Sequence, residues 1–169
     1  MITETAFAKL NLALHVRRRR DDGYHELETV FAFVDVGDAL TFTAAQDLAL
    51  TIDGPFAAPL LAEAAEDNLI LRVARAMQSH FSVSHGAAIH LSKTLPVASG
   101  IGGGSADAAA AARGLNLLWD LGASEAELTL AAGGLGADIP ACIASTSARG
   151  EGVGEALTPL GDVFTGLPV

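Results

Sequence analysis

The stretch that most constrains how this chain can fold runs from residue 93 to residue 113. There a predicted strand end, a glycine-rich bend and an alanine-rich segment follow one another directly. Glycines at 100 and 102–104 can adopt positive φ angles and carry no Cβ, so successive backbone N–H groups can point into one concavity. A helix beginning near Ser105 would add unpaired amides and the positive end of its dipole. The stretch therefore predicts a site that binds a phosphate group.

Two familiar phosphate-loop patterns do not fit this stretch. The pattern G-x-x-x-x-G-K-[ST] fails because no lysine follows the glycines, and G-x-G-x-x-G fails because position 105 is serine. The glycines by themselves would also fit a plain strand-to-helix bend or a flexible linker. The phosphate interpretation therefore needs support from the rest of the chain.

Length and composition predict one folded domain over residues 1–169, with 50% hydrophobic residues and a formal charge of −10. This charge argues against a broad nucleic-acid surface, because such surfaces need clustered positive potential. We see neither a signal peptide nor the roughly 18 uninterrupted apolar residues of a membrane span, so we expect a cytoplasmic protein without a membrane partner. Cys142, the single cysteine, is interpreted as a small buried residue.

Alternating apolar residues predict strands in the first third of the chain. Residues 10–16 predict a half-buried strand with Leu10, Leu12, Leu14 and Val16 on one face. A second strand is expected from Tyr24 to about residue 34, and two shorter ones over 39–44 and 47–52. Four arginines and Asp21-Asp22-Gly23 lie between the first two strands and predict a charged hairpin tip rather than a nucleic-acid site.

The remainder predicts mainly helices. Residues 59–65 have some helical tendency, residues 66–68 begin a clearer helix, and residues 87–92 predict a strand that leads into the glycine stretch. Ser124 and Glu127 form a capping box, and a second glycine-rich bend over 133–140 presents Asp138 near a helix start. The last segments, 149–155 and 157–169, predict a turn with a strand.

Three motifs, in this order and spread over most of the chain, resemble the GHMP small-molecule kinases. They are Ala-Lys-Leu-Asn-Leu at 8–12, Leu-Pro-Val-Ala-Ser-Gly-Ile-Gly-Gly-Gly-Ser-Ala-Asp at 95–107 and Gly-Ala-Asp-Ile-Pro at 136–140. Three further segments, at 22–27, 66–70 and 151–155, resemble one branch of the family. That branch uses ATP and Mg²⁺ to phosphorylate the 2-hydroxyl of 4-diphosphocytidyl-2-C-methyl-D-erythritol in non-mevalonate isoprenoid precursor synthesis.

The resemblance implies an α+β fold, that of the GHMP-kinase N-terminal domain. This fold has a ribosomal-protein-like, left-handed βαβ unit and a mixed, mostly antiparallel sheet backed by helices. It also implies a C-terminal domain that this sequence lacks. We therefore expect an exposed apolar face, a tendency to self-associate, and weak or no activity of this chain by itself.

The resemblance makes Asp138 and Lys9 the catalytic pair. Phosphoryl transfer to an alcohol needs a group that accepts the hydroxyl proton and compensation for developing negative charge. Asp138 would be the base, and Lys9 would orient it and stabilise the incipient alkoxide. Without the resemblance, Asp138 would also fit a helix cap and Lys9 a solvated strand residue.

The same carry-over assigns the nucleotide site. Asn68 and Lys93 would border the adenine, although Asn68 would also fit a plain helix N-cap. Ser105 would meet a phosphate oxygen or its Mg²⁺. Ala98 and Ser99 replace glycines that relatives often have, so we expect a stiffer first half of the loop. The loop residues assigned to ATP are Pro96, Val97, Ala98, Ser99, Gly100, Ile101, Gly102, Gly103, Gly104, Ser105 and Ala106.

The alcohol substrate would lie on the N-terminal hairpin. Tyr24 would stack on the cytosine, His25 would hydrogen-bond its edge, and Asn11 would reach the methylerythritol hydroxyls. Alternatively, His25 caps the hairpin turn and Tyr24 covers the sheet edge. Two other functions stay open at this point: another GHMP kinase, such as a homoserine or mevalonate kinase, and a non-catalytic nucleotide-binding module.

Overall fold

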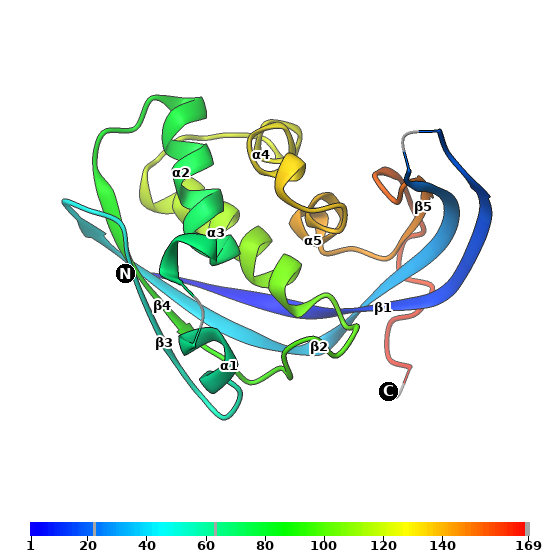
Figure 1. Cartoon of the computed structure of the whole chain (residues 1–169), viewed down its shortest axis with the longest axis horizontal. Helices are drawn as coiled ribbons and strands as arrows, with labels where there is room; N and C mark the ends of the chain where they lie inside the picture. The colour runs from blue at the N-terminus through cyan, green and yellow to red at the C-terminus, as the bar shows by residue number, and fades with distance from the viewer. Residues whose placement is uncertain (22, 63, 168–169) are drawn as a thin grey trace.

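A long, curved hairpin dominates the computed structural model, which describes residues 1–21, 23–62 and 64–167 (Figure 1). Its strands are β1 (Ile2–Arg19) and β2 (His25–Ala45). Asp22 of the predicted hairpin tip and the final two residues of the predicted last segment lie outside the described residues. The remaining elements are β3 (Ala49–Asp53), α1 (Ala58–Leu61), η1 (Ala65–Asp67), α2 (Leu69–Phe81), β4 (Gly86–Ser92), α3 (Gly103–Leu118), α4 (Glu125–Ala132), η2 (Gly133–Leu135), α5 (Ile139–Ala144), β5 (Ala148–Gly152) and β6 (Ala156–Pro159).

Strand β2 is the central strand of a sheet that has six strands in the described part of the chain. It pairs antiparallel with β1 along one edge, and with β4 and β5 on the other. β5 in turn pairs antiparallel with β6, whereas β3 lies parallel to β4. The parallel pair, with α1 and α2 between its strands in the chain, forms a βαβ unit. The expected α+β fold with a mixed, mostly antiparallel sheet is therefore confirmed.

The helices α2 to α5 gather on one side of the sheet (Figure 1), and the core lies between this layer and the strands. The alanine-rich α3 is central: Ala106 and Ala108–Ala112 are all buried. Small side chains let this helix approach the sheet closely, and Gly114 marks the tightest point. A Cβ on Gly114 would lie 2.2 Å from the ring of Phe42 on β2.

The hairpin differs from the sequence prediction in length and burial. The segments expected at 24–34 and 39–44 are one continuous strand, β2, and β1 starts at residue 2. Leu12, Leu14 and Val16 are 49%, 53% and 60% exposed, so the prediction of a half-buried strand face was wrong here. The hairpin extends and curls past the helical layer (Figure 1), with register shifts that add twist. The exposed apolar face expected where a second domain would pack stays a prediction.

The helix boundaries follow the predicted local signals closely. Asn68 caps α2 by accepting a hydrogen bond from the N–H of Ile70, and Ser124 and Glu127 form the expected capping box at α4. The helix after the glycine loop begins at residue 103, two residues before the predicted start, because Gly102 with φ +67° provides its N-cap. Cys142 is buried, as interpreted. No described helix has the length and apolarity needed to cross a membrane.

Candidate active site

Lys9 lies at the centre of the candidate site, on the strand β1 at a register shift. Its side chain is 2% exposed, which excludes the solvated alternative. The Nζ atom donates a hydrogen bond to Oδ1 of Asn11 at 2.8 Å and lies 4.4 Å from the centre of the Phe31 ring. A buried ammonium needs such partners, because desolvation otherwise disfavours its charge.

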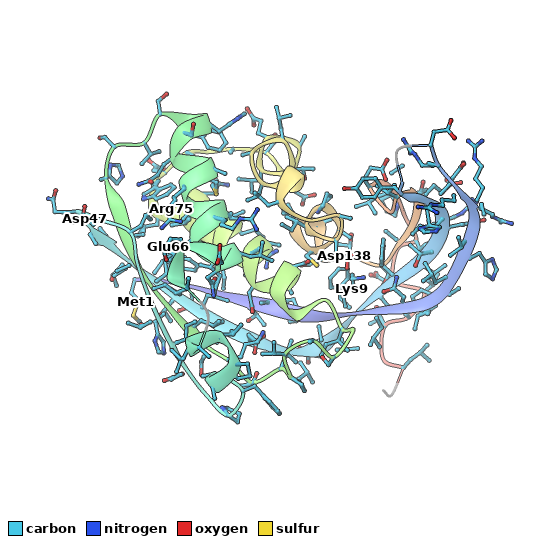
Figure 2. All side chains as sticks on the ribbon, in the orientation of Figure 1. Met1, Lys9, Asp47, Glu66, Arg75 and Asp138 are labelled. Carbon is cyan, nitrogen blue, oxygen red and sulfur yellow. The ribbon has the colours of Figure 1, made fainter. Side chains whose placement is uncertain are left out.

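Asp138 approaches Lys9 from the opposite end of the chain (Figure 2). It occupies the N-cap position of α5, as the helix-cap alternative predicted, but its side chain makes no capping hydrogen bond to that helix. Instead, its Oδ2 atom lies 3.2 Å from Nζ of Lys9. The Asp138 side chain is 41% exposed, whereas Lys9 is enclosed. The pair thus presents a carboxylate to an incoming molecule above a fixed positive charge.

The glycine loop is attached directly to this lysine. The backbone N–H of Lys9 donates to the carbonyl oxygen of Ile101 at 2.9 Å. A Cβ on Gly102 would lie 2.9 Å from Cε of Lys9, so the loop sits on the lysine stem. Directly after Gly102, α3 begins and directs its first backbone N–H groups toward the loop. A group bound at the loop would therefore lie near Lys9.

Gly100 separates two hollows. On one side, a hollow of about 280 Å³ lies along the glycine loop. On the other, a cleft of about 430 Å³ contains Lys9, Asn11 and Asp138. Gly100 lines both. The loop hollow is further lined by Leu60, Leu69, Lys93, Pro96, Val97, Ala98, Ser99, Gly102, Gly103, Gly104, Ser105 and Asp107.

A smaller hollow of about 120 Å³ adjoins the loop hollow and shares Leu60, Leu69, Gly104 and Asp107 with it. Asn68 lines this smaller hollow, while Lys93 lines only the larger one. The two residues assigned to the adenine thus lie in adjoining spaces. In the described residues, no group of three or more His, Cys, Asp or Glu side chains is arranged to hold a metal ion.

Lys93 belongs to a buried cluster beneath the loop. Its Nζ atom donates to Oδ2 of Asp38 at 2.5 Å and to Oδ2 of Asp107 at 2.7 Å. The other oxygen of Asp38 accepts the backbone N–H groups of Thr94 and Leu95. Oδ1 of Asp107 is buried and has no hydrogen-bond partner among the residues that the structure describes. Burial, opposed by Lys93 and reinforced by Asp38, raises the pKa of Asp107 to about 7.

The sequence did not predict this cluster. Asp107 stood inside the quoted loop motif without a role, and Asp38 follows a glycine on a strand with no local signal of burial. Lys93 was expected at the adenine, and the structure adds that its ammonium is already shared between two carboxylates. Only the register of β2 against β4, which opposes Ala39 to Ser92, brings Asp38 to Lys93.

Asn11 is held in the Lys9 cleft by a chain of hydrogen bonds. Its Nδ2 atom donates to Oγ1 of Thr29 at 2.8 Å, and that hydroxyl donates to the carbonyl oxygen of Ala13 at 2.8 Å. Tyr24, 61% exposed, and His25, also exposed, lie further along the hairpin and do not line the cleft. The structure thus brings Lys9, Asn11 and Asp138 together but leaves Tyr24 and His25 outside this group.

Sequence reasoning missed the apolar walls of the cleft. Leu14, Leu27 and Phe31 come from the hairpin, and Val153 and Gly154 from the turn between β5 and β6. Alternation alone assigned the hairpin residues to a strand face, without showing that the face borders a cleft. The segment Glu-Gly-Val-Gly-Glu at 151–155 contributed only to the resemblance, yet two of its members line the cleft.

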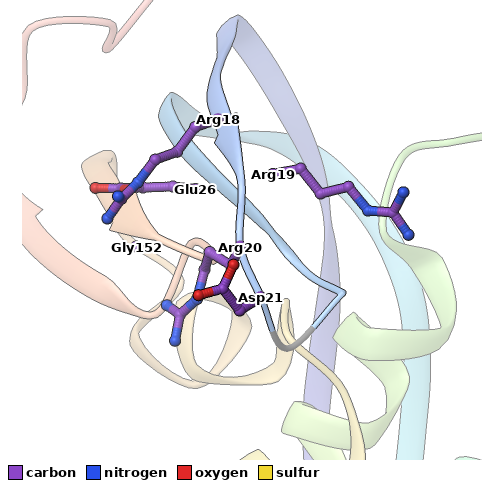
Figure 3. A pocket seen from close by; sticks show the side chains of 6 residues that line it. All are labelled: Arg18, Arg19, Arg20, Asp21, Glu26 and Gly152. Atoms are coloured by element: carbon purple, nitrogen blue, oxygen red, sulfur yellow. The ribbon is translucent and has the colours of Figure 1, made fainter.

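The arginine-rich end of the hairpin is mainly a set of cross-strand ion pairs. Arg17 pairs with Glu28 and Arg18 with Glu26. An open hollow of about 500 Å³ lies beside Arg18, Arg20 and Gly152, and Figure 3 shows Arg19 extending away from Arg18 and Glu26. The acidic partners on β2 support the interpretation of a charged hairpin.

Comparisons with known proteins show which proteins this chain is similar to. Residues 68–146 match the family model of the GHMP kinases N terminal domain. The 4-diphosphocytidyl-2-C-methyl-D-erythritol kinase of Ruegeria pomeroyi is 51% identical over 153 residues, which make up 90% of this chain and 52% of that protein. The Rhizorhabdus wittichii enzyme of the same name is 46% identical over 99% of this chain and 57% of its own length. The chain therefore spans about half the length of the curated relatives it matches.

Solved structures show the same likeness. A crystal structure of 4-(cytidine 5'-diphospho)-2C-methyl-D-erythritol kinase is 36% identical with a TM-score of 0.76, covering 94% of this chain and 55% of that one. Homoserine kinase from Cytophaga hutchinsonii has a TM-score of 0.65 at 19% identity, covering 88% of this chain and 47% of that one. The second likeness shows the fold alone.

Proposed function

We propose that this chain belongs to the GHMP kinases and supplies the catalytic pair and the ATP loop of an enzyme that phosphorylates the 2-hydroxyl of 4-diphosphocytidyl-2-C-methyl-D-erythritol. The observation that carries the proposal is the position of Asp138, 3.2 Å from the buried Lys9 ammonium and beside the glycine loop. Because the chain spans about half the length of its relatives, we expect it to be weakly active or inactive by itself.

The cleft supports the role of Asp138 as a base. Its carboxylate is accessible, so a substrate hydroxyl can come within hydrogen-bond distance and transfer its proton to it. The hydroxyl oxygen then attacks the γ-phosphorus of ATP, the bond to the β-γ bridging oxygen breaks, and ADP leaves. Lys9 stabilises the negative charge that develops on the attacking oxygen, and its enclosure makes that interaction stronger than it would be in water.

The loop hollow supports the role of the ATP side. Glycines at 102–104 leave the α3 N-terminus accessible to phosphate oxygens, and the adjoining space beside Asn68 would take the adenine. Mg²⁺ would arrive with ATP and neutralise its phosphate charge, with Ser105 as a nearby hydroxyl. Gly100 lines both hollows, so the γ-phosphate and the hydroxyl would meet beside it.

On the alcohol side, Asn11 is placed to hydrogen-bond the methylerythritol hydroxyls next to Lys9. Tyr24 and His25 remain our candidates for the cytosine. They lie on the same hairpin and are exposed, and a phenol ring and an imidazole are of the kind that gives a pyrimidine the π-face and the polar edge it requires. For them to act, the substrate must extend from the Lys9 cleft along the hairpin.

The Asp138→Asn variant tests the proposal, assayed in the longest product of the coding sequence that contains this chain. The readout is ADP formation with 4-diphosphocytidyl-2-C-methyl-D-erythritol as acceptor. We expect the turnover number to fall at least about 100-fold, while ATP binding changes little because Asp138 does not line the loop hollow. Asp120→Asn, an exposed aspartate after α3, is the matched control. Unchanged turnover in Asp138→Asn would remove the catalytic assignment.

A further inference from the structure

Arg113 connects the two elements that carry Lys9 and Asp138. It projects from α3, and its Nε and Nη2 atoms donate to Oε2 of Glu4 and to the carbonyl oxygen of Thr5, both at 2.9 Å. Its Nη1 atom donates to the carbonyl oxygens of Cys142 at 2.8 Å and Ile143 at 3.3 Å. One side of the guanidinium therefore holds β1, and the other holds the end of α5.

We propose that Arg113 is a positioning residue that fixes the separation between Lys9 and Asp138. The inference rests on the proposed function, in which these two side chains form the catalytic pair. Within the described part of the chain, no hydrogen bond or ion pair joins Arg113 to either side chain, and Arg113 lines neither the loop hollow nor the cleft. It acts on the pair through β1 and α5.

The short length of α5 explains why the hydrogen bonds from Arg113 matter for the position of Asp138. The helix has six residues, so its ends are only about 9 Å apart and a displacement of its last turn moves Asp138 as well. Isolated helices of this length are not stable in water, and their position depends on tertiary contacts. A cation at the carbonyl end of α5 also complements the negative end of its dipole.

The other contacts of α5 do not replace these hydrogen bonds from Arg113. The N–H of Ile139 donates to the carbonyl oxygen of Gly136, which anchors α5 only to the preceding bend. Ile139, Ala141, Cys142 and Ile143 are buried and give the helix an apolar seat. Apolar packing is non-directional, so it tolerates small slides that a set of directed hydrogen bonds opposes.

Arg113→Met tests the proposal because methionine keeps much of the apolar stem and removes the donors. A displacement of about 1 Å in a reacting group can cost about 100-fold in rate. We expect the turnover number per ATP-binding site to fall about 30- to 100-fold, with the KM for ATP changed less than about 3-fold. Arg113→Lys retains one charged donor group and should restore part of the turnover.

Three comparisons separate this role from a general loss of structure. Arg75→Met removes an exposed arginine from α2 and should leave turnover unchanged. Glu4→Gln keeps an acceptor for Nε and does not touch α5, so its effect should be small. A crystal structure of Arg113→Met should show the Lys9 Nζ to Asp138 Oδ2 distance longer than the 3.2 Å of the unaltered chain. This last measurement needs no turnover, and Arg113→Lys can replace Arg113→Met if the latter does not fold.

The outcomes are distinguishable. If Asp138→Asn keeps full turnover, the proposed function fails. If Asp138→Asn loses turnover but Arg113→Met keeps it, or keeps the Lys9 to Asp138 distance, only the positioning role is overturned. Equal losses in turnover number and ATP affinity in Arg113→Met would also overturn it, because they would indicate a general structural defect.

Discussion

Replacing Asp107 by asparagine should remove a pH dependence from the stability of this chain. Asp107 is 3% exposed, and its pKa is raised from 3.8 to about 7, mainly by burial. The folded protein therefore holds this proton more tightly than the unfolded chain does. The stabilisation that the proton provides is fully present below pH 3.8 and is lost as the pH rises through about 7. Asparagine has the same shape and no such proton.

The magnitude follows from the two pKa values. The full difference between 3.8 and about 7 corresponds to about 4 kcal/mol of unfolding free energy, at about 1.4 kcal/mol for each tenfold change in proton affinity. Between about pH 5 and about pH 8 the accessible part is about 2.5 kcal/mol. The substitution also removes one carboxylate partner of Lys93, which changes the unfolding free energy by a separate amount. Asp38 still accepts a hydrogen bond from the Lys93 ammonium. This separate amount varies much less with pH in this range.

Urea unfolding followed by circular dichroism at about pH 5, 6, 7 and 8 measures the effect. The difference in unfolding free energy between Asp107→Asn and the unaltered chain should change by about 2.5 kcal/mol in favour of the variant as the pH rises. Asp47→Asn, an exposed aspartate between β2 and β3, is the matched control and should give a constant difference. Parallel curves for Asp107→Asn and the unaltered chain would refute the argument that burial raises this pKa.

Three further substitutions test the loop, the core and the hairpin. Gly102→Ala should lower turnover at least about 10-fold, because its Cβ would lie 2.9 Å from Cε of Lys9; normal turnover would show that Lys9 can move without cost. Gly114→Ala should lower the unfolding free energy by about 3 kcal/mol, measured with urea, because its Cβ would lie 2.2 Å from the Phe42 ring. Tyr24→Ala should raise the KM for 4-diphosphocytidyl-2-C-methyl-D-erythritol about 10-fold and leave the KM for ATP unchanged, and equal KM values for this substrate would exclude stacking by Tyr24.

Local sequence signals predicted the parts of the fold that depend on neighbouring residues. Asn68 and Ser124 cap helices as their spacing indicated, because capping is satisfied within one turn. The exposure of Leu12 and Leu14 was not predictable in the same way. Alternation shows that side chains share a face, whereas burial depends on whether another layer covers that face. Here the hairpin extends beyond the helices that cover the rest of the sheet (Figure 1).

The candidate site likewise has parts that the sequence predicted and parts that only the fold identifies. The motifs that carry Lys9 and Asp138 were visible in the sequence, but their 3.2 Å approach depends on the curl of β1 and the seat of α5. Asp38 and Arg113 had no motif at all. Both act across large sequence separations, Asp38 on Lys93 and Arg113 on Glu4 and Cys142, so only the folded arrangement identifies them.

The structure shows a second physical role for the glycines of the loop. From the sequence, its glycines were needed so that a phosphate could approach the backbone. In the structure, two of them also make room for lysines: a Cβ on Gly102 would press on the stem of Lys9, and one on Gly103 would lie 3.3 Å from Nζ of Lys93. By contrast, a Cβ on Gly100 would meet nothing within 4 Å, and that residue is required by its φ of +79°. The loop therefore limits how closely the side chains of Lys9 and Lys93 can approach the space proposed for the phosphates. A larger residue at 102 or 103 would disturb those cations even if it left the phosphate path open.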